Sequence, residues 1–120
     1  VPYLALENVT LNYSHPCVID IKMGRQTFEP TASQDKMERE KNKYPHQSLV
    51  GFRITGFKVY DSITGKYFEV RKEFGRGLTP DLVKTGLASF FHNGTSYRLD
   101  IIHRVIQYLE ILLQWITIQK

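Results

Sequence analysis

Cysteine is almost absent from this chain of 120 residues, since Cys17 is the only one. A single thiol cannot form an internal disulfide, which excludes a disulfide-stapled scaffold and is typical of a reducing compartment or of an unpaired thiol. The histidines, at positions 15, 46, 92 and 103, do not have the spacing of metal ligands. The pattern therefore argues against a zinc site.

Long hydrophobic runs are also lacking. A membrane-spanning helix needs about 20 mostly apolar residues, and the longest apolar stretch, residues 99–118, is interrupted by charged and polar side chains. No signal-peptide pattern opens the chain, which starts without Met at Val1 inside an apolar run, as a cut end would. Together with the lone cysteine, this favours a cytoplasmic or nuclear protein.

Several common catalytic motifs are missing too: there is no glycine-rich phosphate loop, no G-x-S-x-G and no C-x-x-C. What remains is the composition of a globular domain, with 42% hydrophobic and 23% charged residues. Sixteen Lys and Arg against 12 Asp and Glu give a net charge of +4. This mild excess is compatible with an anionic partner.

The order of the expected elements predicts an α+β fold. Apolar patterning and turn residues predict strands at residues 3–9 and 16–24, a polar helix at 33–44, a hairpin of strands at 50–60 and 67–74, and helices at 79–91 and 99–119. Because strands and helices do not alternate regularly, we expect an antiparallel sheet with packed helices. The apolar stripe of the last helix predicts a buried face.

Two charges interrupt the otherwise apolar strand at residues 16–24. Side chains alternate along a strand, so Asp20 and Lys22 share one face while Ile19 and Ile21 share the other. Burying two charges is costly unless they are paired or hold a ligand. A structural ion pair, a solvent-facing edge and a binding site are all compatible with this pattern.

The polar helix carries a second cluster. Lys36, Arg39, Glu40 and Lys43 follow the i, i+3, i+4, i+7 spacing and therefore lie on one helical face. Three cations on one face suit a polyanion such as a molecule with several phosphates. A solvated helix face, with Glu40 paired internally, is the alternative.

A third cluster follows the second hairpin strand, with Lys66, Arg71, Lys72 and Arg76 near aromatic residues. Basic residues interleaved with aromatics occur on nucleic-acid surfaces. Here Glu69 and Glu73 dilute the charge, which argues against nucleic acid as a partner. An edge strand protected by charges is the alternative reading.

Several segments resemble the inositol polyphosphate kinase family. Residues 16–24, PCVIDIKMG, match its P-x-x-x-D-x-K-x-G signature, and residues 6–10, LENVT, resemble a family segment at the expected interval. Residues 51–60, GFRITGFKVY, resemble its G-x-x-x-x-G-x-x-V-Y strand, and residues 75–76 and 90–94 also match. Residues 43–45, 90–94 and 113–115 are most similar to the multikinase subfamily.

The resemblance implies a fold, a reaction and a site. It implies one partial kinase domain over residues 1–120, the central part of a two-lobed kinase, which runs from a hinge at about residues 1–10 through the inositide-binding region to helices of the C-terminal lobe. The expected activity is ATP-dependent phosphorylation of an inositol polyphosphate with Mg²⁺. The site residues carried over by resemblance are Glu7, Asn8, Val9 and Asp20 for ATP, Asp20 and Lys22 for catalysis, and Lys22, Lys36, Arg39, Glu40, Lys43 and Lys72 for the substrate.

The chain also departs from the family pattern. Arg39 and Glu40 stand where multikinases carry uncharged amides, and Lys72 stands where a glutamine is usual. The added cations favour a more highly phosphorylated inositol, whereas the charge of Glu40 opposes phosphate.

The family's N-terminal lobe and its C-terminal metal site have no counterpart here, so we expect no metal ligands within this chain and little activity from it alone. A non-catalytic module that binds inositides or nucleic acid, and a helical interaction domain, are the alternative functions.

Overall fold

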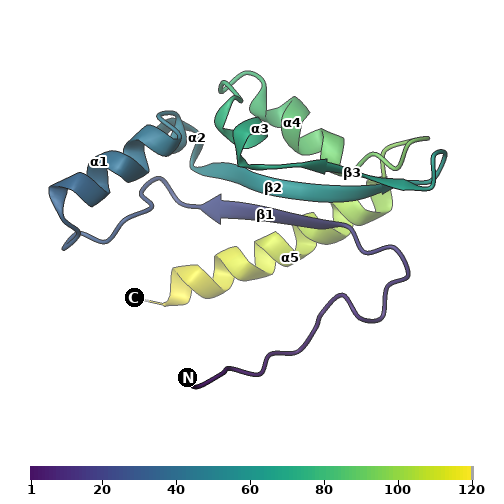
Figure 1. Cartoon of the computed structure of the whole chain (residues 1–120), viewed down its shortest axis with the longest axis horizontal. Helices are drawn as coiled ribbons and strands as arrows, with labels where there is room; N and C mark the ends of the chain where they lie inside the picture. Colours follow the sequence, from purple (N-terminus) through teal and green to yellow (C-terminus); the bar gives the residue numbers. More distant parts are fainter. Residues whose placement is uncertain (120) are drawn as a thin grey trace.

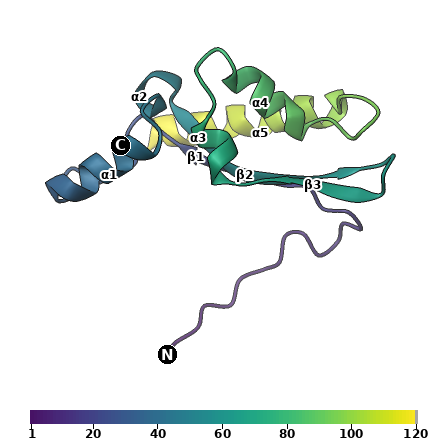
Figure 2. The ribbon, with the colours of Figure 1, turned by 45° about the horizontal axis from the view of Figure 1, so that its top comes forward.

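The computed structural model describes residues 1–119 and confirms the α+β class. A three-stranded antiparallel sheet with the order β1-β2-β3 forms its centre. The elements in chain order are β1 (Val18–Met23), α1 (Gln34–Lys43), α2 (Gln47–Val50), β2 (Phe52–Asp61), β3 (Lys66–Val70), α3 (Lys72–Arg76), α4 (Val83–Phe90) and α5 (Leu99–Ile118). Figure 2 shows α4 and α5 on one side of the sheet.

A β-bulge decides which side chains face the core. In the ladder of β1 and β2, Asp20 pairs with Gly56 but Ile21 pairs with Ile54, so Thr55 is an extra residue on β2. In a regular strand without a bulge, Ile54 and Phe57 would point to opposite faces, because they are three residues apart. The bulge puts both on the core face and leaves Asp20 and Lys22 of β1 and Arg53 and Lys58 of β2 on the other.

The core lies between the sheet and the helices that follow β3. Ile54, Phe57 and Val59 are buried, and Phe74 of α3 and Phe90 of α4 pack against them with several half-buried apolar residues. The rings of Phe74 and Phe90 each meet the ring of Phe57 edge-on at 5.7 Å between centroids. This packing fixes α3 against β2, which places the residues at both ends of α3 beside the sheet.

Glycine is required where α3 crosses β2. A Cβ atom on Gly75 would lie 1.7 Å from the carbonyl oxygen of Ile54, a distance at which no side chain fits. The helix can therefore approach the strand this closely only because residue 75 has no side chain.

The helical segment α1–α2 is anchored to the end of β1 (Figure 1). Ser33 caps α1 by accepting from the backbone N–H of Lys36, and the helix ends at Lys43, one residue before the predicted end. Tyr44 is buried and donates its hydroxyl to the carbonyl of Leu78 at 2.7 Å. Gln47 is also buried, and its Nε2 donates to the carbonyls of Lys22 and Gly24. These contacts hold α1 next to the end of β1 that carries Lys22.

Three sequence predictions of secondary structure were wrong. Residues 3–9 form no strand, because no other strand among residues 1–119 pairs with them. The second hairpin strand ends at Val70 rather than at residue 74, since the chain turns into α3 at Lys72. The helix expected from residue 79 begins at Val83, and residues 79–82 form a turn in which Leu82 donates its N–H to the carbonyl of Thr79.

The last helix has the predicted bounds but not the predicted burial. α5 runs from Leu99 to Ile118, yet none of its residues is buried. Only its first turns are half-buried, at Ile101, Ile102 and Val105, because the helix diverges from the sheet further along (Figure 1). No helix within residues 1–119 combines the length and apolarity that a membrane span requires.

Candidate functional site

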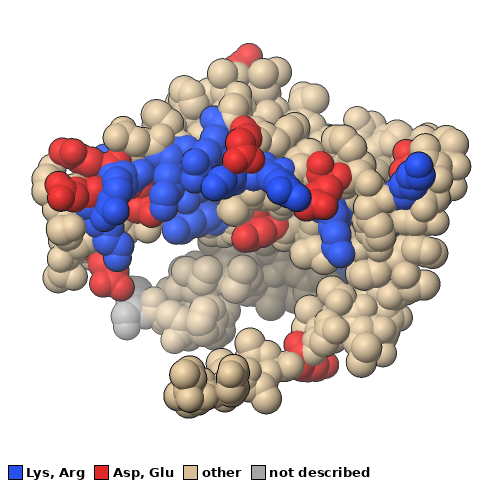
Figure 3. Space-filling model, viewed as in Figure 1, with Lys and Arg blue, Asp and Glu red and all other residues tan. Residues whose placement is uncertain are grey.

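A basic cleft lies on the polar face of the sheet, opposite the core. Its charged lining residues come from β1, α1, β2 and α3, and we call them together the basic cleft: Asp20, Lys22, Lys43, Arg53, Lys72 and Arg76. Figure 3 shows Lys and Arg side chains gathered in a band over α1 and along the sheet. Five cations and one acid around one hollow give a strongly positive potential, which attracts anions.

Asp20 lies at the edge of this cleft. Its side chain is exposed, and it makes no ion pair with any residue from 1 to 119. Asp20 and Lys72 also line a second, more open hollow over β2 and β3. The alternative reading of Asp20 and Lys22 as a structural ion pair finds no support in this geometry, because Lys22 is paired elsewhere.

Lys22, Lys43 and Arg53 share a single carboxylate, that of Glu40. An oxygen of Glu40 lies 3.7 Å from Nζ of Lys22 and 3.6 Å from Nη2 of Arg53, and Lys43 donates a hydrogen bond to the other oxygen. The Glu40 side chain is only 11% exposed. We call these four residues the Glu40 cluster.

The cluster changes the acidity of Glu40. The hydrogen bond from Lys43 lowers the pKa of Glu40 to about 2, against the opposing effect of burial, and the hydroxyl of Thr27 and the charge of Lys22 add to the lowering. Glu40 is therefore ionised at neutral pH. One negative charge faces three positive charges, so the cluster keeps a net positive charge.

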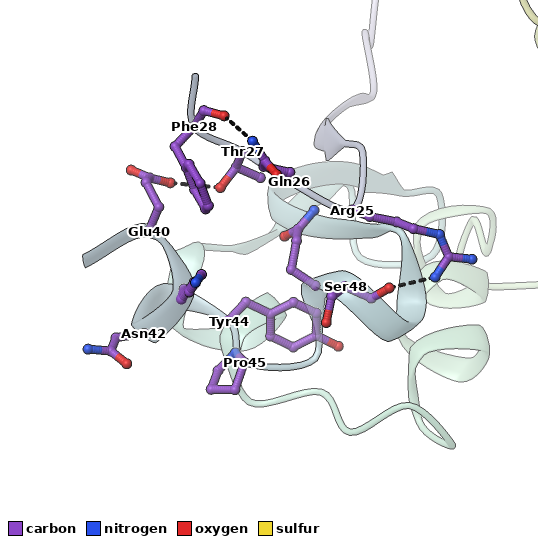
Figure 4. Close-up of a pocket in the computed structure, with 11 residues that line it drawn as sticks. Arg25, Gln26, Thr27, Phe28, Glu40, Asn42, Tyr44, Pro45 and Ser48 are labelled. Atoms are coloured by element: carbon purple, nitrogen blue, oxygen red, sulfur yellow. Dashed lines mark hydrogen bonds between the residues drawn. The ribbon is translucent and has the colours of Figure 1, made fainter. Parts of the chain in front are cut away.

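The loop that follows β1 also contacts Glu40 (Figure 4). The hydroxyl of Thr27 donates to Oε2 of Glu40 at 3.1 Å, and Arg25 donates to the carbonyl of Ser48. The loop begins at Gly24, whose φ of 105° lies in the left-handed region that favours glycine. The final glycine of the signature thus allows the chain to turn back onto α1.

The cations of α3 reach the cleft because of where that helix begins. α3 starts at Lys72, two residues after β3 ends, and its close contact at Gly75 keeps it against β2. Lys72 and Arg76 are one helical turn apart and therefore project to the same side. Both line the basic cleft.

Two of the predicted substrate residues lie apart from this cleft. Lys36 and Arg39 are exposed on α1 and do not line the hollow. Nε of Arg39 donates to the carbonyl of Asp35 on its own helix. The structure thus brings together Asp20, Lys22, Lys43 and Lys72, with Glu40 beneath them, and leaves Lys36 and Arg39 further out on the same helix.

The predicted ATP residues Glu7, Asn8 and Val9 lie in the N-terminal segment, which leaves the sheet on the side away from α4 and α5 (Figure 2). All three are exposed. The hydrogen bonds within this segment are local: the side chain of Asn8 accepts from the backbone and hydroxyl of Thr10. Their expected contact with adenine stays a prediction.

The described residues do not by themselves form a magnesium site. No group of three or more His, Cys, Asp or Glu side chains that would suit a metal ion occurs within residues 1–119. Asp20 is the one carboxylate lining the basic cleft, and Glu40 is already engaged by cations. Since Mg²⁺ in proteins needs further oxygen ligands, these residues do not fit a dedicated site for it.

Sequence reasoning missed Arg53 and Arg76 as lining residues of the cleft. The signal for Arg53 is its position directly across the ladder from Lys22. That signal is readable only when the register of β1 and β2 is known. Arg76 was included in the third basic cluster, but its predicted surroundings, just beyond a strand, were wrong.

The chain is similar to kinases of inositol phosphates. Residues 3–120 match the family model described as inositol polyphosphate kinase. The mouse inositol polyphosphate multikinase is 41% identical over 98% of this chain, and the human inositol hexakisphosphate kinase 3 is 36% identical over 98%. The chain spans about 30% of the length of these relatives.

Solved structures agree with this similarity. A structure of an inositol phosphate multikinase superposes with a TM-score of 0.69 and 30% identity, covering 79% of this chain and 46% of that one. The multikinase of S. cerevisiae in complex with ADP and Mn²⁺ superposes with a TM-score of 0.64 and 25% identity, covering 77% and 43%. The α+β fold is therefore one found in multikinases.

Proposed function

Because this chain belongs to the inositol polyphosphate kinase family, we propose that it forms the substrate-binding part of an ATP-dependent inositol polyphosphate kinase. The complete protein would transfer the terminal phosphoryl group of ATP to a hydroxyl of an inositol polyphosphate, with Mg²⁺ as cofactor. The observation that carries this proposal is the basic cleft, which five cations and one exposed acid line together.

The cleft suits a substrate with several phosphates. Phosphates at different positions of an inositol ring need cations that approach from different directions, and these cations come from two strands and two helices. Lysine offers a point charge and arginine a planar fork to such groups. Lys36 and Arg39, further along α1, extend the positive surface and are assigned to the outer phosphates of the substrate.

Asp20 and Lys22 are assigned to the reaction itself. Both project from the same face of β1 into the cleft, where a phosphoryl group in transfer would be surrounded by positive charge. Catalysis of phosphoryl transfer depends mainly on positioning and on electrostatic stabilisation. Lys22 supplies charge to the transferred group, and Asp20 faces the nucleotide.

Nucleotide binding is assigned to the N-terminal segment. Glu7, Asn8 and Val9 are exposed, and apart from the carbonyl of Asn8, which accepts from the N–H of Leu11, their backbone groups are available to the edge of an adenine ring. The yeast relative binds ADP and Mn²⁺, which supports a nucleotide and a divalent ion as requirements here. The residues described here do not by themselves form a site for that ion.

A direct assay tests the proposal. The complete protein is incubated with ATP, Mg²⁺ and a panel of inositol phosphates that differ in the number and position of phosphates, and products are separated by anion-exchange chromatography. We expect a product with one more phosphate from at least one member of the panel, together with ADP. ADP release that does not depend on any inositol phosphate would contradict the proposal.

Binding without transfer would support the alternative function. If the complete protein binds inositol phosphates in calorimetry but forms no product with ATP and Mg²⁺, it is a non-catalytic inositide-binding module. The single carboxylate of the cleft is the observation that favours this second candidate, because Asp20 alone offers few ligands to a divalent ion.

A further inference from the structure

Arg53 is the most deeply buried charge of the basic cleft. Its side chain is 8% exposed, whereas those of Lys22 and Lys43 are 44% and 37% exposed. The bulge at Thr55 keeps Arg53 on the polar face of β2, directly across the ladder from Lys22. The sequence thus puts an arginine at the floor of the cleft, beneath two lysines that reach the solvent.

The guanidinium of Arg53 is incompletely paired. Its Nη2 lies 3.6 Å from the carboxylate of Glu40, beyond hydrogen-bond distance for this pair, and its Nη1 is buried with no hydrogen-bond partner among residues 1–119. A guanidinium carries five N–H donors. Leaving such donors buried and unpaired is costly, and native proteins rarely do so without a ligand or a bound water.

The charges around Arg53 are mostly positive, which also favours an anion. The one carboxylate of Glu40 is shared with Lys22 and Lys43, and Lys43 donates the direct hydrogen bond. Lys72 and Arg76 add two more positive charges to the same hollow. An anion at the floor of the cleft would accept from the unpaired Nη1 of Arg53 and would offset the excess of positive charge.

We propose that Arg53 binds a phosphate group of the inositol polyphosphate substrate at the floor of the basic cleft, and that Glu40 is the residue that positions Arg53 for this contact. This inference rests on the function proposed above and deepens it. The planar fork of arginine can donate two parallel hydrogen bonds to one phosphate, which lysine cannot do. The phosphate at the floor is an additional one, beside those that the exposed lysines meet.

Glu40 acts through its neighbours rather than on the substrate. Its Oε2 accepts from the hydroxyl of Thr27 (Figure 4). The same oxygen lies 3.6 Å from Arg53 and 3.7 Å from Lys22. A carboxylate in direct contact with a phosphate would repel it. In its observed place, Glu40 instead fixes the direction of Arg53 and lowers the cost of burying that charge.

Binding of unlabelled inositol polyphosphates to the complete protein, measured by isothermal titration calorimetry without ATP or Mg²⁺, tests this inference. Arg53→Met should weaken binding about 10- to 100-fold, the range expected for charge-assisted hydrogen bonds, and Arg53→Lys should weaken it less. ADP affinity should not change in either variant. Lys58→Met is the matched control, because Lys58 is a cation on the same face of β2 that lies outside the basic cleft.

A double-mutant cycle tests the role of Glu40. Glu40→Gln should weaken inositol polyphosphate binding in the wild-type background but change it little in the Arg53→Met background, because the group that Glu40 positions is then gone. A residue with a purely structural role would lower affinity equally in both backgrounds. Equal losses would overturn the positioning role.

The outcomes separate this inference from the proposed function. If the wild-type protein binds inositol polyphosphates and Arg53→Met binds them as well as Lys58→Met does, the inference on Arg53 is wrong while the proposed function stands. If the wild-type protein binds none, both are wrong. If Arg53→Met does not fold, Arg53→Lys decides, and an unchanged affinity in that variant would overturn the inference.

Discussion

Lys22 and Arg53 stand opposite each other in the ladder of β1 and β2, and their charged groups lie 3.7 and 3.6 Å from the same oxygen of Glu40. Two like charges at directly opposed positions of a sheet repel each other. The carboxylate of Glu40 offsets this repulsion from a helix that approaches over the polar face. Lys22 and Arg53 can therefore stand side by side in the cleft because Glu40 of α1 lies close to both.

The first prediction concerns catalysis. In the complete protein, Asp20→Asn and Lys22→Ala should each lower turnover about 10²- to 10³-fold, the usual effect of removing a charge aimed at a reacting group. Their melting temperatures should change little, since Asp20 makes no ion pair within residues 1–119 and Lys22 is 44% exposed. Glu69→Gln is the control, because Glu69 is an exposed acid of β3 on the same polar face of the sheet.

Turnover and melting temperature must be measured on the same samples. Early melting with near-normal turnover would mean that Asp20 and Lys22 are structural, and the catalytic assignment would be abandoned.

The second prediction concerns the outer part of α1. Lys36→Ala should weaken inositol phosphate binding about two- to fivefold, as expected for an exposed charge, and leave ATP binding unchanged. The loss should shrink as salt is added, because exposed charges are screened beyond about 8–10 Å at physiological ionic strength. Lys41→Ala is the control, since the ammonium of Lys41 lies over the ring of Phe28 instead. Equal losses for ATP and for inositol phosphate would remove Lys36 from the substrate site.

The third prediction concerns pH. The pKa of Glu40 is lowered to about 2 in the folded protein and is near 4.3 in an unfolded chain. The folded state therefore binds fewer protons at this group, so its contribution to stability is complete above about pH 5 and is lost as the pH falls toward 2. One pKa unit corresponds to about 1.4 kcal/mol, so the loss is at most about 3 kcal/mol.

Glu40→Gln should flatten this dependence. Denaturant unfolding of both proteins at a series of pH values from 7 to 2 measures it, and the free energy of unfolding should fall more steeply for the wild-type protein. Parallel curves would show that Glu40 is not the titrating group.

The fourth prediction concerns the contact between α3 and β2. Gly75→Ala should lower the free energy of unfolding by more than about 2 kcal/mol, because the new Cβ would meet the carbonyl oxygen of Ile54 at 1.7 Å and the backbone must move. Gly77→Ala, two residues on, should be nearly neutral, since its Cβ would meet only ordinary contacts of 3.4 Å or more. Similar unfolding curves for the two variants would contradict the close approach.

Local pattern was sufficient for much of this fold. The polar helix after residue 33, the hairpin between the strands at 50–60 and 67–74, and the bounds of α5 follow from short-range chemistry, and the structure confirms them to within a few residues. The predicted strand at residues 3–9 was wrong because alternation cannot supply a partner strand. The exposure of α5 was missed for a similar reason, since periodicity shows which face is apolar but not what covers it.

The candidate site was predictable only in part. Asp20 and Lys22 follow from strand alternation and from the family signature, and both line the cleft. Arg53 was missed, because its face depends on the extra residue at Thr55, which only the register reveals. The inward direction of Glu40 depends on Thr27 and Lys43 together. The face of Arg53 and the direction of Glu40 both depend on contacts with other segments, which local sequence patterns do not reveal.

The sheet has the order β1-β2-β3, so β1 is an edge strand among residues 1–119. In an antiparallel pair, every second residue of an edge strand directs its backbone groups away from its partner. Along β1, amide hydrogens that bond to β2 should therefore exchange slowly with deuterium, and those of the residues between them should exchange fast. A further strand could add at this edge by backbone pairing alone and leave Asp20 and Lys22 untouched, since a sheet can grow at its edge without changing what its face displays.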